Sequence, residues 1–314
     1  MNFDFKTIHQ FNDTLKDEKT CYEFFEQVRW NGVPVCPHCG SLKKPYKVKA
    51  RGKFTDIPSY RCSERLCDLP FTVRTGSIFE GSKVEFRKSL QAAFELSTCK
   101  NGISSVELAN RIGTSQKTAW LINHKLRGML NETEPALLKD VASVDETLIG
   151  GKNRNKHADK RIPNSQGRSA KGKTIVFGAK GLSGKVRTKV VPNVESETLI
   201  PIIEKWIEKG SIMVSDDWKS FKALKQNYFH IVVNHSLGEY VNGAFSTNGI
   251  ENFWSLFKRG VSRTHHSISP KHCQKYADEF SERHNNKDIS NVTLFHKLIG
   301  KSDKERVTYK VLTA

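Results

Sequence analysis

Three acidic residues of this chain stand where an apolar segment ends or a helix begins. Asp145 lies inside the strand-forming run VASVDETLIGG, Asp216 ends the apolar part of SIMVSDD, and Glu251 lies in TNGIENFWSLFKRG. Carboxylates that crowd together repel one another unless cations neutralise them. Mg²⁺ accepts carboxylate oxygens, and two such ions about 3.5–4 Å apart can drive an in-line phosphoryl transfer. We therefore expect these three residues to bind Mg²⁺ or Mn²⁺.

The order of the predicted elements explains how residues so far apart in the sequence can meet. Strands are predicted at 141–151, 172–181 and 185–194, an amphipathic helix at 196–210, strands at 211–221 and 228–235 with a short helix between them, and a helical region from 247 onward. This succession is typical of a ribonuclease H-like α/β fold, in which the first and fourth strands are neighbours. Asp145 and Asp216 would then lie side by side, with Glu251 packed across the same sheet edge. Lys258 follows Glu251 by about two helical turns and projects from the same helix face.

Each of the two strand acids has an acidic neighbour, and only one of each pair can face the site. Successive side chains of a strand point to opposite faces, so Glu146 and Asp217 are the alternatives to Asp145 and Asp216. We choose Asp145 because the apolar Val144 precedes it, and Asp216 because it is the first acid after the run IMV. Any one of these residues alone could be an ordinary surface acid. The ordered trio followed by a lysine argues against that alternative.

Four of the seven cysteines form two pairs near the N-terminus. Cys36 and Cys39 stand in VCPHCGS, and Cys62 and Cys67 stand in YRCSERLCD. A C-x2-C pair lets two thiolates grip one tetrahedral ion, and the following glycine permits the positive-φ turn of a zinc knuckle. With the short β-prone runs between the pairs, this pattern predicts a zinc ribbon that holds a structural Zn²⁺. The alternative is a redox-active C-x2-C beside two free thiols.

Residues 85–130 show helical periodicity in three segments, EFRKSLQAAFELS, SSVELANRIG and SQKTAWLINHKLRGML. Ser104 and Ser105 suit the start of the second helix, and Gly113 ends it shortly before the third. Two helices joined by a tight glycine-containing turn are typical of a helix-turn-helix, although a plain three-helix packing module has the same pattern. The residues predicted to give the third helix a surface suited to the major groove of DNA are Lys117, Asn123, His124, Lys125 and Arg127.

The chain as a whole is strongly basic, with 51 Lys and Arg against 33 Asp and Glu and a formal charge of +18 over 314 residues. This surplus indicates a polyanionic partner, because Lys and Arg gain affinity by releasing counterions from phosphates. Ordinary solubility is the alternative. The surplus is dense at 152–173, where eight basic residues stand against one acid. We expect Lys152, Arg154 and Lys156 to bind DNA phosphates there.

Two features of the sequence bear on the compartment. The chain has no run of about 18 apolar residues, which argues against a membrane span. The N-terminal MNFDFKTIHQ lacks the basic and apolar regions of a secretory signal. We therefore expect a cytoplasmic, nucleoid-associated protein with reduced thiols.

In combination, these motifs resemble those of a known family. The stretches CPHCG, TGSIFEGSK, VDETLIGGKNRNKH, VSDDWKSF, NHSLGEYVNG and TNGIENFWSLFKRG are similar to those of bacterial insertion-sequence transposases of the ISXO-type group, and together they span roughly residues 30–290. The resemblance implies a zinc ribbon joined to a ribonuclease H-like domain of the DDE or DDNK type. It also implies metal-dependent DNA strand cleavage and strand transfer at the element's terminal repeats, with no covalent enzyme intermediate.

The resemblance carries over to individual residues. It places the first two catalytic acids on Asp145 and Asp216 and the lysine on Lys258. Part of the family has an asparagine at the third position, and this sequence offers both Asn248 and Glu251. We favour Glu251 for its charge and helix register, and Asn248 stays open as the alternative ligand.

On this interpretation the chain has four parts. Residues 1–80 would hold an N-terminal helix and the zinc ribbon, 81–135 the helix-turn-helix segment, 140–295 the catalytic domain and 296–314 a C-terminal tail. The expected partner is double-stranded DNA, both transposon ends and target, bound by a homodimer or larger oligomer because two ends must be held at once.

Two other classes of protein remain as alternatives. The first is a non-catalytic, sequence-specific DNA-binding protein derived from a transposase, and the intact acidic trio argues against it. The second is a nuclease that acts on RNA–DNA hybrids, which leaves two upstream DNA-binding modules unexplained.

Overall fold

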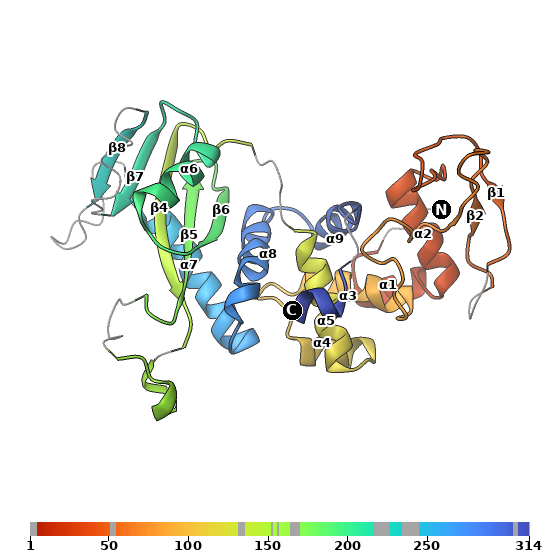
Figure 1. Ribbon diagram of the computed structural model, residues 1–314, viewed down its shortest axis with the longest axis horizontal. Helices are drawn as coiled ribbons and strands as arrows, with labels where there is room; N and C mark the ends of the chain where they lie inside the picture. Colours follow the sequence, from red (N-terminus) through yellow and green to blue (C-terminus); the bar gives the residue numbers. More distant parts are fainter. Residues whose placement is uncertain are drawn as a thin grey trace. The chain divides into compact units, whose positions relative to one another are not determined.

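The computed structural model describes residues 5–50, 55–130, 136–151, 153–155, 157–163, 170–216, 227–233, 245–303 and 307–313. The chain divides into two compact units (Figure 1). Met1–Leu130 and Asp288–Ala314 form the first, here called the helical unit, and Asn131–Lys287 form the second, here called the α/β unit. The predicted segments 1–80 and 81–135 thus fall almost entirely within the helical unit, to which the end of the chain returns.

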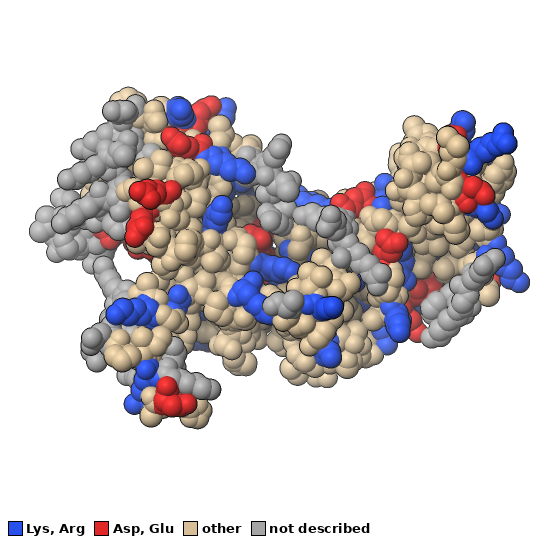
Figure 2. Space-filling model, viewed as in Figure 1, with Lys and Arg blue, Asp and Glu red and all other residues tan. Residues whose placement is uncertain are grey.

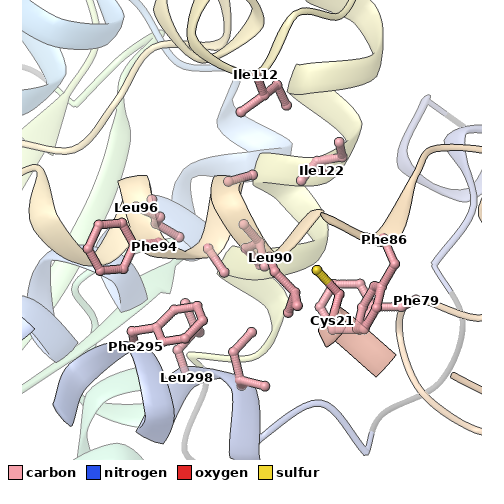
Figure 3. Close-up of a cluster of buried hydrophobic side chains, with 14 of the residues drawn as sticks. Cys21, Phe79, Phe86, Leu90, Phe94, Leu96, Ile112, Ile122, Phe295 and Leu298 are labelled. Atoms are coloured by element: carbon pink, nitrogen blue, oxygen red, sulfur yellow. The ribbon is translucent and has the colours of Figure 1, made fainter. Parts of the chain in front are cut away.

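The helical unit is organised around one aromatic core. Its helices are α1 (Ile8–Thr14), α2 (Glu18–Trp30), α3 (Phe86–Thr98), α4 (Ser105–Ile112), α5 (Gln116–Gly128), α9 (Asn291–Gly300) and α10 (Tyr309–Thr313). The rings of Phe5, Phe11, Phe24, Phe94 and Phe295 lie with centroids 5.1–6.2 Å apart in contacting pairs. Figure 3 shows Phe94 of α3 close to Phe295 of α9. Burial of such large rings is the main stabilising contribution to this unit.

Helices α4 and α5 begin and end at residues that the sequence marks. The Ser104 hydroxyl accepts a hydrogen bond from the Glu107 backbone N–H at 3.1 Å, and Ser115 accepts one from Thr118 at 3.3 Å. Gly113 ends α4 with φ of +61°, a conformation that costs a glycine little because it has no Cβ. The predicted pair of helices with a short glycine-containing turn is therefore present.

A small three-stranded sheet follows α2. Strands β1 (Tyr46–Lys47), β2 (Tyr60–Arg61) and β3 (Pro70–Phe71) pair antiparallel in the order β1-β2-β3. The rings of Tyr60 and Phe71 stack 5.6 Å apart and pack with Cys36 and Cys62 in a small buried cluster. Strands of two residues bury too little surface to be stable by themselves, so this sheet needs a crosslink.

The α/β unit is built on a five-stranded mixed sheet in the order β6-β5-β4-β7-β8. Its strands are β4 (Val141–Ile149), β5 (Thr174–Gly181), β6 (Val186–Val191), β7 (Ile212–Asp216) and β8 (Phe229–Val233), with the short 3₁₀ turns η1 (Asn153–Asn155) and η2 (Ala158–Lys160) between β4 and β5. Strands β4, β5 and β6 pair antiparallel, whereas β7 joins β4 and β8 joins β7 in parallel. The predicted succession of strands is confirmed, and so is the mixed α/β class.

Helices cover both faces of this sheet (Figure 1). Helix α6 (Ser196–Trp206) packs on one face. The other face carries α7 (Asn248–Gly260) and α8 (Cys273–Asn285), joined through a π-helical turn η5 (Val261–His265) and a 3₁₀ turn η6 (Pro270–His272). We call these the α6 face and the α7 face.

Candidate functional site

Four cysteine thiols of the helical unit lie in one cluster. The Sγ atoms of Cys36, Cys39, Cys62 and Cys67 all lie within 4.8 Å of one another. The Sγ atoms of Cys36 and Cys67 are 3.8 Å apart, and those of Cys39 and Cys62 are 3.6 Å apart. A tetrahedral Zn²⁺ is bound by four thiolates at this kind of separation, and such a site leaves no position open for water. The residues present therefore fit a structural zinc ion.

Local backbone geometry explains how both pairs of cysteines reach the cluster. Gly40, directly after Cys39, has φ of +70°, and its N–H donates to the Cys36 carbonyl at 2.8 Å. Asp68 occupies the matching position after Cys67 with φ of 45°. There the Arg61 guanidinium donates to both carboxylate oxygens of Asp68, at 2.7 and 2.6 Å. The second pair is thus followed by a non-glycine residue in the same left-handed region of φ.

Strand pairing brings two of the predicted acids together. Strands β4 and β7 run parallel with Ser143 opposite Val214. Two residues further along both strands, the same register would set Asp145 opposite Asp216, the last residue of β7. Side chains at matching positions of adjacent strands point to the same face of the sheet. The two side chains therefore belong to the same face of the sheet, and the charge of Asp216 raises the pKa of Asp145.

The alternation along β4 also decides between Asp145 and its acidic neighbour. Ala142 and Val144 pack in the cluster on the α6 face, whereas Ile149 packs in the cluster on the α7 face. Asp145 has the same parity as Ile149, so its side chain belongs to the α7 face. Glu146 belongs to the α6 face. The helix that carries the third acid covers the face to which Asp145 belongs.

Helix α7 carries Glu251 in its first turn, exposed beside a buried stripe. Ile250, Phe253 and Trp254 pack against the sheet and fix the helix on it. The hydroxyl of Thr247, the residue before the helix, donates to Glu251 Oε1 at 3.1 Å. Since Thr247 is only 1% exposed, its hydroxyl is a rigid donor that restricts the Glu251 carboxylate.

The electrostatics of Asp145 show that the three acids interact. The pKa of Asp145 is raised to about 7, mainly by burial and also by the nearby charges of Glu146, Glu251 and Asp216, against a backbone hydrogen bond that lowers it. Like charges that face one another favour the protonated acid until a cation neutralises them. The donors are oxygen atoms of the kind that Mg²⁺ binds, so the residues fit a hard divalent cation.

The thiol cluster and the three acids differ in how close their potential ligand atoms are to one another. Among the residues that the structure describes, only the four cysteines form a cluster of potential metal ligands. The three acids are therefore not gathered as tightly as the four thiols.

The remaining predicted residues of the site lie on α7. Asn248 is its first residue and Glu251 stands three positions later, so both lie on neighbouring parts of the same helix face. Lys258 is exposed in the last turn, about two turns beyond Glu251. The chain thus places both alternatives for the third ligand at the same end of the helix.

Four of the five residues predicted to give α5 a DNA-binding surface are buried, which contradicts the exposure predicted for them. Asn123, Lys125 and Arg127 are 1%, 9% and 2% exposed, and His124 is fully buried. The Asn123 amide donates to the Ile103 carbonyl at 3.4 Å, and the Lys125 ammonium donates to the Ile78 carbonyl at 3.1 Å. These polar side chains satisfy backbone acceptors inside the helical unit.

The other residues predicted to bind DNA fall into two groups. Lys117 is exposed on α5, and its ammonium lies 4.3 Å from the centroid of the Tyr309 ring in α10. Lys152, Lys156 and the side chain of Arg154 lie outside the described residues.

Sequence reasoning missed residues of the α7 face that support the site. Thr247 restricts Glu251, as described above, and the Lys180 ammonium donates to the Gly249 carbonyl in the first turn of α7 at 3.1 Å. Gly178 lies against Trp254. A lone glycine inside a predicted strand signals a close backbone approach, so IVFGAKG contained a usable signal for Gly178. For Thr247 and Lys180 the sequence holds no comparable signal.

Comparisons with known proteins identify the family to which the two sites belong. Residues 137–285 match the ISXO2-like transposase domain, and residues 16–68 match the transposase zinc-ribbon domain. The two matches coincide with the carboxylate site and the thiol cluster. A protein with this pair of domains is a zinc-ribbon transposase.

Relatives extend the similarity over most of the chain. A transposase-like protein of Haemophilus influenzae is 37% identical over 117 residues, which are 37% of this chain and 94% of the relative. A protein of the transposable element ISH50 from Halobacterium salinarum is 25% identical over 279 residues, 86% of this chain and 92% of the relative. The chain belongs to the family of insertion-sequence transposases that carry the ISXO2-like domain. None of its described helices is long and apolar enough to cross a membrane.

Proposed function

We propose that the α/β unit is a ribonuclease H-like catalytic domain that cleaves and joins DNA at the ends of an insertion sequence. The observation that supports this proposal is that the charges of Glu251 on α7 and Asp216 on β7 both raise the pKa of Asp145 on β4. The parallel β4–β7 pair beside an antiparallel β4–β5–β6 meander supports the fold assignment. The family match supports the reaction class.

The proposed reaction is a pair of in-line phosphoryl transfers without a covalent enzyme intermediate. In the first, a water oxygen bonds to phosphorus, the 3′ oxygen leaves with the bonding electrons, and the water loses a proton to solvent. In the second, the freed 3′-hydroxyl attacks a phosphate of target DNA in the same way. Two Mg²⁺ ions would stabilise the charge that develops on attacking and leaving oxygens. Asp145, Asp216 and Glu251 would hold those ions, with Asn248 as the alternative third ligand, and Lys258 would contact a DNA phosphate.

DNA binding is assigned to three parts of the chain. We propose that α4 and α5 act as a helix-turn-helix, for which their capped geometry and the exposed Lys117 are the support. The zinc ribbon and the basic segment 152–173 supply further contacts to phosphates. On the face shown in Figure 2, Lys and Arg side chains are spread over both units, as sequence-independent contact with DNA requires. The proposed assembly on DNA is a homodimer or larger oligomer, because both ends are processed together.

The test is cleavage of DNA that carries the element's terminal repeats, in Mg²⁺ or Mn²⁺. Wild-type protein nicks these ends and joins them to a second DNA. Asp145→Ala and Asp216→Ala abolish both steps while DNA affinity stays within about twofold, because the two acids bind metal and not DNA.

The alternatives give different results in the same assay. End-specific binding without cleavage by the wild type indicates a DNA-binding protein derived from a transposase. Cleavage confined to RNA–DNA hybrids indicates a hybrid-specific nuclease. Loss of DNA binding together with activity in both variants means that the acids are structural.

A further inference from the structure

Helix α7 touches the sheet at a residue that has no side chain. A Cβ placed on Gly178 of β5 would lie 2.6 Å from Cζ2 and 2.7 Å from Cη2 of Trp254. Real Cβ atoms essentially never approach heavy atoms closer than 3.0 Å, so only glycine permits this contact. Trp254 is 3% exposed and belongs to the buried cluster on the α7 face. The indole therefore rests directly on the backbone of β5.

The position of this contact matters because of its partner across the sheet. Gly178 is paired with Asp145 in the β4–β5 ladder. Trp254 stands three residues after Glu251, which is one turn of α7. The contact between Gly178 and Trp254 therefore lies beside Asp145 across the ladder and one helical turn from Glu251 along α7.

A second contact on the same strand fixes the start of the helix. Lys180, two residues after Gly178 and therefore on the same face, donates to the Gly249 carbonyl at 3.1 Å. Gly249 lies between the two alternatives for the third ligand, Asn248 and Glu251. Strand β5 thereby holds α7 at two points, one in each of its first two turns.

We propose that Gly178 is a positioning residue for the metal site: by letting Trp254 rest on the backbone of β5, it sets the height of α7 above Asp145. This inference rests on the proposed function. It does not depend on whether Glu251 or Asn248 is the third ligand, since both ride on the same turn of α7. Ligand groups must be held within about 0.5 Å of the working geometry for a metal site to function, and a methyl group between strand and indole displaces the helix by more than that.

The experiment measures metal binding apart from catalysis. Mn²⁺ binding to zinc-loaded protein is titrated by calorimetry, and the Asp145→Ala variant identifies the part that belongs to the acidic site. Gly178→Ala raises the dissociation constant of that site about tenfold, a loss typical of residues that orient metal ligands. End cleavage falls in parallel, and DNA affinity is unchanged.

Two further variants separate positioning from a general loss of stability. Gly181→Ala is the matched control, because Gly181 is on the same strand but its added Cβ would meet Leu138 at 3.1 Å, in the cluster on the α6 face. Its Mn²⁺ affinity stays within about twofold of wild type. Trp254→Phe removes the two atoms that clash, so the double variant Gly178→Ala/Trp254→Phe binds Mn²⁺ more tightly than Gly178→Ala alone.

The outcomes are distinguishable. Equal Mn²⁺ affinity in Gly178→Ala and Gly181→Ala overturns this inference while leaving the proposed function in place. Absence of Asp145-dependent Mn²⁺ binding in the wild type overturns the proposed function and the inference with it. If Gly178→Ala does not fold, Lys180→Met serves instead: it removes the contact to Gly249 without adding bulk, and an unchanged Mn²⁺ affinity overturns the role of β5.

Discussion

The thiol cluster and the carboxylate group differ in how much of the fold is needed to assemble each. The four thiols come from two short hairpin turns within 32 residues, and local backbone geometry alone gathers them. The three acids come from two strands and a helix spread over more than 100 positions, and the whole α/β unit is needed to bring them together. A metal site in which all four positions are protein ligands stabilises the fold around it. A site with open positions on a rigid sheet edge leaves room for a substrate.

The pKa values of two carboxyl groups, Asp145 and Glu26, are raised for partly different reasons. Asp145 and Glu26 both have a pKa raised to about 7. For Glu26 of α2 the cause is burial, and the Tyr60 hydroxyl that donates to it at 3.1 Å lowers the value. For Asp145 burial is joined by three neighbouring acids. Near Glu26 the charge of Glu23 also raises the pKa and that of Lys47 lowers it, whereas the charges of Glu146, Glu251 and Asp216 all raise the pKa of Asp145.

The largest expected effect is the loss of zinc. Cys62→Ser, or a strong chelator, unfolds the ribbon, because its two-residue strands bury little surface and structural zinc contributes about 10 kcal/mol or more. Metal analysis finds about one zinc per wild-type chain, and near-ultraviolet circular dichroism follows the ribbon. Cys99→Ser, which changes a thiol outside the cluster, keeps the zinc. A full complement of zinc in Cys62→Ser would contradict the assignment.

The next effect sharpens the identity of the third acid. Glu251→Gln lowers the rate of end cleavage about a thousandfold, or ~4 kcal/mol, because a neutral amide neither balances nor binds the metal ions as a carboxylate does. Asn248→Ala is measured beside it. A larger loss in Asn248→Ala than in Glu251→Gln assigns the third ligand to the asparagine instead.

A smaller effect is expected at the hydroxyl that restricts Glu251. Thr247→Val keeps the shape of the side chain and removes the donor, so the Mn²⁺ dissociation constant of the acidic site rises about tenfold. Thr247→Ser retains the hydroxyl and should bind Mn²⁺ nearly as the wild type does. Equal affinities in the two variants would show that the hydrogen bond has no role in metal binding.

The smallest effect concerns Glu26 and depends on pH. Its folded pKa, about 7, exceeds the value of 4.5 for a free glutamate, so the folded protein binds the proton more tightly than the unfolded chain. The free energy of unfolding of the wild type, relative to that of Glu26→Gln, therefore falls as pH rises from about 5 to 7. The decrease is about 1–2 kcal/mol in total for this half-buried group, and the difference is constant above pH 7. Urea unfolding of both zinc-loaded proteins measures it. A difference that is independent of pH would show that Glu26 is ionised throughout.

The sequence predicts the strands of the α/β unit well because their apolar runs are bounded by turn residues. It does not show which face α7 covers. The choice of Asp145 over Glu146 has its structural basis in the packing of Ile149 and Val144 in clusters on opposite faces. The thiol cluster needed no such information. Four cysteines in two close pairs specify their own geometry.

Helix α5 shows where sequence reasoning fails. The polar residue types of Asn123, Lys125 and Arg127 predict an exposed surface suited to the major groove. Asn123 and Lys125 instead reach backbone carbonyls of distant segments, at Ile103 and Ile78. A pattern of residue types along one helix holds no information on acceptors supplied by other segments, so this burial could not be predicted.

The return of α9 to the helical unit has a consequence for biosynthesis. Phe295 is fully buried among aromatic rings contributed by residues 5, 11, 24 and 94, which leave the ribosome long before it does. The aromatic core of the helical unit is therefore incomplete in a nascent chain until the whole α/β unit has been made. A chain released before residue 295 lacks part of this core, so its helical unit is less stable than that of the full chain.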